Sequence, residues 1–181
     1  FPAMFAPLAK WATRIEDARR IPEYIARAWN VAISGRPGPV VIALPEDILH
    51  EDGGPAPVRA VTPAKAALDP AFVEQVRERL SLAERPMLIL GGSGWTDVAT
   101  DAISGWAERL GLPVALSFRR KDLIRNDHPG YAGDLGLGPN PRLVARVKDA
   151  DLLLVIGARL GENPTQGYTL LDRAKTAETL I

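Results

Sequence analysis

A short apolar run between two proline-containing turns places the strongest constraint on the fold of the first segment. Residues 40–44 (VVIAL) are continuous and rich in β-branched side chains. Pro37 and Pro39 exclude a helix directly before this run, and Pro45 ends it. Such a run predicts a β-strand that is covered on both faces. Because a lone strand leaves its backbone groups unpaired, this strand requires further structure beside it.

A single helix is predicted before this strand. Pro22 suits a first helical position, and Gly35 suits a helix stop. One apolar face is predicted between them, formed by Ile21, Tyr24, Ile25, Ala28 and Ala32. One helix and one strand do not make an independent domain. We therefore expect residues 1–50 to be the end of a larger α/β domain, and both ends of the chain to be cut rather than natural.

A change of composition separates this segment from the rest of the chain. Residues 51–57 (EDGGPAP) have no periodicity and are rich in helix breakers. Such a run is typical of a domain boundary. We predict a partial domain over 1–50, a linker over 51–66 and a second domain over 67–181.

Strands alternate with helices in the second domain. Apolar runs at 87–90, 114–116 and 152–156 predict strands, and residues 179–181 predict the beginning of a fourth. The helices are expected to begin after Asp69 and Asn140, each followed by proline, and between these two over 98–110. The middle helix is expected to bury Val98, Ala102, Ile103, Trp106 and Leu110. Residues 117–139 are predicted to be irregular. This order predicts an α/β fold with an open, doubly wound parallel sheet.

Composition excludes several classes of function. Lysine and arginine number 22, as do aspartate and glutamate, so the formal net charge is zero. Binding to nucleic acid normally needs a basic surface, so no nucleic-acid partner is expected. Cysteine is absent, which excludes thiolate metal sites and thiol nucleophiles. No apolar run approaches the roughly 18 residues that span a bilayer. We expect no membrane partner and a cytoplasmic location.

Glycine-rich residues follow the first strand of the second domain. Gly91, Gly92 and Ser93 lie between a predicted strand and a predicted helix, where backbone amides and the helix dipole can hold a phosphate. The spacing departs from the dinucleotide motif, because Asp97 stands where its third glycine would be. The same glycines also suit a tight turn without a ligand, and the sequence leaves both alternatives open.

A second glycine segment follows the last long strand. Gly157, Ala158 and Arg159 lie at the carboxyl end of residues 152–156, and ligands of open α/β sheets bind at such ends. Arg159 could pair with a phosphate through two hydrogen bonds. Alternatively, it pairs with a carboxylate at an interface.

Other polar motifs carry weaker signals. The basic run 118–121 (FRRK) could neutralise a diphosphate or form a solvated surface. Residues 133–136 (GDLG) contain one aspartate without a second cluster of oxygen ligands, so no metal site is predicted. The two histidines, His50 and His128, have no nucleophile in a recognisable spacing. We therefore predict no catalytic residue in this chain.

Several motifs, in their order along the chain, resemble the acetolactate synthase-like family of thiamine-diphosphate-dependent enzymes. They are residues 5–11 (FAPLAKW), 21–23 (IPE), 34–40 (SGRPGPV), 44–47 (LPED), 85–92 (RPMLILGG), 127–129 (DHP), 131–133 (YAG) and 150–160 (ADLLLVIGARL). The resemblance implies that residues 1–50 end a pyrimidine-binding domain and that residues 67–181 form most of a Rossmann-like central domain. It also implies that the glutamate and the metal motif that bind thiamine diphosphate and Mg²⁺ lie outside this chain.

The resemblance implies a parent enzyme that acts as a carboligase or decarboxylase on a 2-oxo acid and assembles as a homodimer or homotetramer. Central domains of this family bind FAD or ADP in some members and are purely structural in others. The matching loop positions are Gly91, Gly92, Ser93, Gly157, Ala158 and Arg159, and Ala158 lacks the hydroxyl donor often found there. The chain alone is expected to be inactive. A non-catalytic nucleotide-binding or structural module is the alternative, and an NAD-linked dehydrogenase is a weaker rival.

Overall fold

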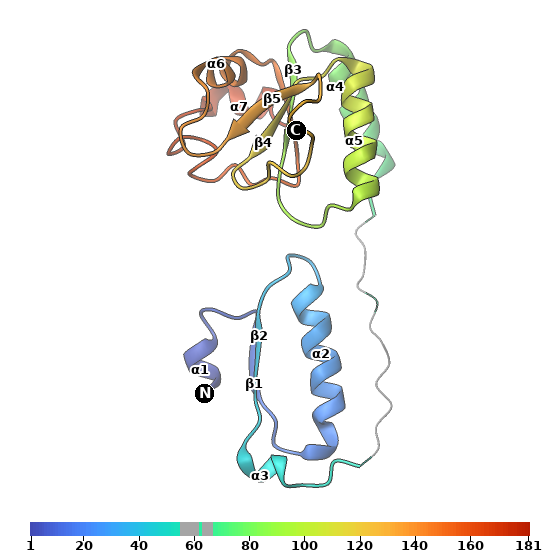
Figure 1. The fold of residues 1–181 in the computed structure, drawn as a ribbon, viewed down its shortest axis with the longest axis vertical. Coiled ribbons are helices and arrows are strands. Elements are labelled where there is room, and N and C mark those ends of the chain that lie inside the picture. The colour runs from blue at the N-terminus through green and yellow to red at the C-terminus, as the bar shows by residue number, and fades with distance from the viewer. Residues whose placement is uncertain (55–61, 63–66) are drawn as a thin grey trace. The chain divides into compact units, whose positions relative to one another are not determined.

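The computed structural model describes residues 1–54, 62 and 67–181, which divide into two units, Phe1–Ala67 and Leu68–Ile181 (Figure 1). The predicted linker, 51–66, falls mostly outside the described residues. Among the residues described, no helix is long and apolar enough to cross a membrane.

The first unit contains a two-stranded parallel sheet with a crossover helix. Its elements are α1 (Pro2–Phe5), β1 (Trp11–Arg14), η1 (Ala18–Arg20), α2 (Ile21–Ile33), β2 (Val40–Ala43) and α3 (Glu46–Leu49). Strand β1 pairs with β2 from Trp11–Val40 to Arg14–Ala43, and α2 runs beside both strands (Figure 1). Ile15, Ala18 and Ile48 form its small buried core.

The first strand of this sheet was not predicted from the sequence. Residues 11–14 (WATR) have neither an apolar run nor a clear alternation, so nothing local indicates a strand. Their extended backbone is stabilised by pairing with β2, which lies about thirty residues later. The predicted strand at 40–44 is confirmed over Val40–Ala43, but in this unit it is half-buried along its length rather than covered on both faces.

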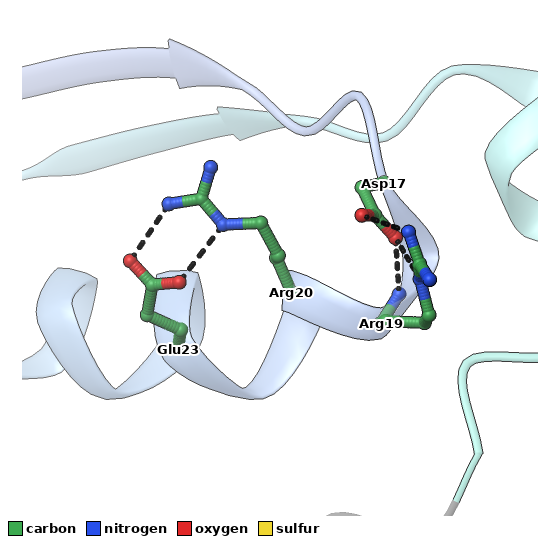
Figure 2. A network of polar contacts seen from close by, with 4 residues as sticks. All are labelled: Asp17, Arg19, Arg20 and Glu23. Atoms are coloured by element: carbon green, nitrogen blue, oxygen red, sulfur yellow. Dashed lines mark hydrogen bonds and ion pairs between the residues drawn. The ribbon is translucent and has the colours of Figure 1, made fainter.

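Two arginine–carboxylate pairs order the entry into α2 (Figure 2). Asp17 accepts hydrogen bonds from the backbone and side chain of Arg19, and these bonds hold the pKa of Asp17 below its ordinary value. Arg20 binds Glu23 through two bonds of 2.9 Å. The Arg20 guanidinium also lies 5.1 Å from the ring centre of Tyr24, which stacks on Trp11. This stack joins α2 to β1.

The carboxyl end of α2 is closed by Lys10, the residue directly before β1. The ammonium of Lys10 donates to the carbonyl oxygens of Val31, Ser34 and Arg36 at 2.5, 2.7 and 3.0 Å. These carbonyls lie in or just after the last helical turn, where backbone acceptors have no partner within the helix and carry partial negative charge. Lys10 therefore couples the start of β1 to the end of α2.

The second unit is a four-stranded parallel sheet in the order β5-β4-β3-β6. Its strands are β3 (Pro86–Leu90), β4 (Val114–Ser117), β5 (Tyr131–Leu135) and β6 (Leu152–Ile156), and its helices are α4 (Pro70–Leu82), α5 (Asp97–Leu110), α6 (Pro141–Asp149) and α7 (Arg173–Thr179). The side chains of Asp69 and Asn140 cap α4 and α6 as predicted. Leu180 forms a parallel bridge with Leu153, so the expected fourth strand begins at the open edge of β6.

Alternating side chains of β3 are buried in two separate core layers, one on each face of the sheet. Leu88 and Leu90 belong to one buried cluster, which α4 and α5 cover, whereas Met87 and Ile89 belong to the other, which includes Leu143 and Val147 of α6. In Figure 1, α5 and α6 lie on opposite sides of the strands. Helices on both faces of a parallel sheet confirm the predicted doubly wound fold.

Two expectations for this unit were wrong in detail, and one helix was missed. Residues 117–139 were expected to be irregular but contain the strand β5, which pairs with β4. Its glycine and aspartate are unfavourable in strands, so the sequence did not indicate it. Helix α7 was not predicted. On α5, Val98 and Leu110 are 79% and 54% exposed, because the helix turns Ala107, which is fully buried, toward the sheet instead.

Asp151 ties the start of β6 to the start of β3. Its carboxylate accepts from the backbone N–H of Glu84 at 2.8 Å and from that of Arg85 at 2.9 Å. Burial raises the pKa of this carboxyl, but the hydrogen bonds from the two backbone donors together lower it by more. The pKa of Asp151 is therefore below its ordinary value of 3.8. These bonds explain why the aspartate directly precedes the apolar strand.

We expect Asp151→Asn to lower the free energy of unfolding by about 1–3 kcal/mol, because an amide offers one acceptor oxygen and sets its NH₂ against a backbone donor. Urea unfolding measures the loss. Asp149→Asn is the control: Asp149 pairs with Arg85 on the surface, so a loss of about 0.5 kcal/mol or less is expected.

The contribution of Asp151 should also depend on pH. A carboxyl whose folded pKa is lowered stabilises the fold fully above pH 3.8 and loses this contribution as pH falls through its folded pKa. The difference from wild type should therefore shrink in acid; a constant difference would contradict this role.

We expect Lys10→Met to loosen the last turn of α2 by about 1–2 kcal/mol, because three carbonyls lose a charged donor. Hydrogen exchange of the backbone amides near Ser34 should then be about 5- to 30-fold faster. Arg36→Met is the matched control, since only the backbone carbonyl of Arg36 takes part. Equal exchange in both variants would show that Lys10 does not hold the helix end.

Candidate functional site

The strand order reverses between β3 and β6. The chain runs from β3 to β4 and β5, then crosses back to place β6 on the other edge of β3. Ligands of open α/β sheets bind outside the carboxyl ends of the strands at such a switch point. All six predicted site residues lie here: Gly91, Gly92 and Ser93 after β3, and Gly157, Ala158 and Arg159 after β6. The topology thus brings together two segments that the sequence separates by more than sixty residues.

The two glycine loops touch through their backbones. The N–H of Gly91 donates to the carbonyl of Ile156 at 3.1 Å. A Cβ on Gly92 would lie 1.9 Å from the carbonyl oxygen of Gly157, and a Cβ on Gly157 would lie 2.6 Å from that of Gly91. Both Gly92 and Gly157 also have left-handed backbones, with φ of 72° and 70°. This loop-to-loop contact explains the glycines without a ligand.

The Trp95 side chain lies beside the two glycine loops. Its indole Nε1 donates to the carbonyl oxygen of Gly91 at 2.7 Å, and a Cβ on Gly157 would lie 3.5 Å from that nitrogen. The indole is partly buried and packs against the core cluster that contains Leu88 and Leu90. Sequence reasoning missed this residue, and its place directly after the glycine segment is the one signal that could have found it.

The amino end of α5 already has polar partners. The Thr96 side chain accepts from the N–H of Ala99 at 3.2 Å, and Asp97 places a carboxylate in the first turn. Negative charge at this end is favourable for the helix dipole. A phosphate would have to compete with Thr96 for amides and would be repelled by Asp97.

The basic residues at this sheet edge are divided between local pairs and solvent. Arg120 pairs with Asp122 at 3.0 Å and Lys121 pairs with Asp134 at 2.9 Å; the latter bond raises the pKa of Lys121. Arg159 is exposed and takes part in none of the ion pairs between described residues. Arg119 has a left-handed backbone, with φ of 62°, and lies over the ring of Phe118 at 5.1 Å. Only Arg119 and Arg159 therefore remain suited to meet an anion.

A cavity of about 490 Å³ lies beyond the carboxyl ends of β4 and β5. It is lined by Phe118, Arg119, Lys121, Asp122, Asp134, Gly136 and Leu137. Asp134 accepts from Lys121 and from the N–H of Gly136, so its oxygens already have partners. Within the described ranges, no group of three histidine, aspartate or glutamate side chains could hold a metal ion. The cavity was not predicted, because β5 was not.

The histidines have structural surroundings. Nδ1 of His128 accepts from the N–H of Gly130 at 3.0 Å in the turn before β5, and its carbonyl accepts from Tyr131. His50 is exposed and ends the short helix α3. No nucleophile lies beside either ring among the hydrogen-bond partners that the described residues provide. Both histidines therefore have turn or surface contacts among the residues that the structure describes.

Comparison with known proteins gives a consistent result. A model of the thiamine pyrophosphate enzyme central domain matches residues 73–181. The large subunit of acetolactate synthase isozyme 2 from Escherichia coli is 30% identical over 151 residues, which are 83% of this chain and 28% of that protein. A probable 2-ketoarginine decarboxylase from Pseudomonas aeruginosa is 34% identical over 168 residues, which are 88% of this chain and 28% of that protein. The chain thus spans less than a third of these relatives.

Solved structures agree with these matches. A putative thiamin diphosphate-dependent enzyme from Mycobacterium smegmatis is similar with a TM-score of 0.72 and 34% identity, over 87% of this chain and 30% of that one. Benzoylformate decarboxylase from Polynucleobacter necessarius is similar with a TM-score of 0.71 and 28% identity, over the same shares. The family model covers more than half of the chain, and the parallel sheet agrees with it. The chain therefore belongs to the acetolactate synthase-like family of thiamine pyrophosphate-dependent enzymes, and residues 73–181 match its Rossmann-like central domain.

Proposed function

We propose that the protein to which this chain belongs is a thiamine-diphosphate-dependent carboligase or decarboxylase acting on a 2-oxo acid. The match of the central-domain model over residues 73–181 carries this proposal. Relatives named for acetolactate synthesis and for decarboxylation of 2-ketoarginine and benzoylformate support it. The last two compounds are 2-oxo acids with different side chains, so the relatives support the reacting group but not one substrate.

We infer that the sites for thiamine diphosphate and Mg²⁺ lie outside the residues that the structure describes. No metal-binding cluster is present among them, and Asp134, which lies in β5 between Gly133 and Gly136, is bound to Lys121 and Gly136. We therefore place both cofactors in parts of the parent that this chain does not span. Within that parent, residues 1–50 are proposed to end the pyrimidine-binding domain and residues 67–181 to form the central domain. A cytoplasmic location remains part of this proposal.

The proposed role of the chain itself is a scaffold. The alternative is a nucleotide-binding module for FAD or ADP, which the position of Arg159 and the glycines at the switch point favours. Against it, the loops after β3 and β6 are in backbone contact, and Thr96 and Asp97 occupy the helix end that would face a phosphate. The contacts support the scaffold better.

We expect the isolated 181-residue chain to release no CO₂ and form no acetolactate from pyruvate when thiamine diphosphate and Mg²⁺ are supplied, because the proposal places the cofactor-binding residues in parts of the parent that the chain does not span. The full-length parent under the same conditions should turn over at least one 2-oxo acid among pyruvate, 2-ketoarginine and benzoylformate. Activity of the pure chain would overturn the scaffold role. A parent that binds thiamine diphosphate and leaves every 2-oxo acid unchanged would overturn the proposed reaction.

The first unit leaves apolar surface uncovered, which supports a proposed homo-oligomer. Ile25 and Trp29 stand one turn apart on the outer face of α2 and are 45% and 63% exposed. We expect the chain to self-associate, with an average mass by light scattering that rises with concentration. Trp29→Glu should weaken this rise, whereas Val98→Glu, a change at a more exposed apolar site on α5, should not. A wild-type chain that stays monomeric at high concentration would contradict the proposal.

A further inference from the structure

We propose that Trp95 is a built-in occupant of the switch-point crevice and that it closes this central domain to nucleotides. The proposal concerns the fold and holds whatever reaction the parent catalyses. It names one side chain that lies against both glycine loops, after β3 and after β6, and so helps to keep them together.

The indole makes one polar contact and one apolar contact beside the glycine loops. Its N–H donates to the carbonyl oxygen of Gly91 at 2.7 Å, so the acceptor at the carboxyl end of the central strand is taken. Its ring packs, partly buried, against the apolar cluster that contains Leu90. An adenine would have to displace both contacts.

The walls of the crevice leave no gap for a diphosphate. The position of a Cβ on Gly92 is 1.9 Å from the carbonyl oxygen of Gly157, which means that the two backbones are already at contact distance. On the third side, Gly91 meets the next strand end: a Cβ there would lie 2.6 Å from that of Ser117 and 2.8 Å from that of Ala158. The loops after β3, β4 and β6 therefore close on one another, and a ligand could enter only if they separate.

The charge at the crevice also opposes a phosphate. Asp97 lies in the first turn of α5, and the Thr96 hydroxyl already accepts a hydrogen bond from one backbone amide there, that of Ala99. Arg159 is exposed to solvent, outside the contacts that join the loops.

The test measures binding of ADP and of FAD to the 181-residue chain by calorimetry and by thermal shift. Wild type is expected to bind neither. Trp95→Ala and Trp95→Leu remove the indole, and the affinity for ADP should rise by about tenfold or more. Leucine keeps apolar contact with the core, so it provides an opening variant if alanine prevents folding. Trp95→Phe loses only the N–H and part of the ring, and should open the crevice less.

Trp106→Phe is the matched control, because Trp106 packs against the same cluster from the middle of α5. It should leave binding unchanged. The proposal is overturned if wild type binds ADP or FAD with protection of the amides of 91–95 and 157–161 from hydrogen exchange. It is also overturned if neither folded opening variant binds, since something other than Trp95 would then keep the crevice closed.

Discussion

Strand β3 is the element on which the rest of the second unit depends. It pairs with β4 on one edge and with β6 on the other, so it lies in the interior of the sheet. Because its side chains alternate between two buried clusters, the helices must cover both faces. Its carboxyl end then becomes the place where the loops of three strands meet. The position of the candidate site follows from this one strand.

The glycines at that meeting point illustrate two physical uses of the same residue. Glycine lets a backbone approach a ligand, but it also lets one loop approach another. Here Gly92 faces the carbonyl of Gly157 and Trp95 covers the carbonyl of Gly91, so the approach is between parts of the protein. A phosphate-binding motif and a loop contact can therefore share a sequence pattern and differ only in what fills the space.

Local signals were reliable where local contacts decide the structure. The caps at Asp69 and Asn140 and the apolar strands β3, β4 and β6 were predicted, since caps bond within two residues and buried strands are apolar throughout. The strands β1 and β5 were not, because residues 11–14 and 131–135 are short and half-exposed and are stabilised by distant partners. The exposure of Val98 depends likewise on how α5 is rotated against the sheet.

The sequence by itself determined the family, the α/β class and the loops that carry the candidate site. Motif order, apolar runs and helix caps can each be recognised from residues close together in the chain. Tertiary structure alone decided the order β5-β4-β3-β6, the contact of Gly92 with Gly157 and the place of Trp95. These features arise from pairing and packing between residues far apart in the chain. No local pattern encodes them, because the free energy of each contact depends on where the rest of the sheet has placed its partner.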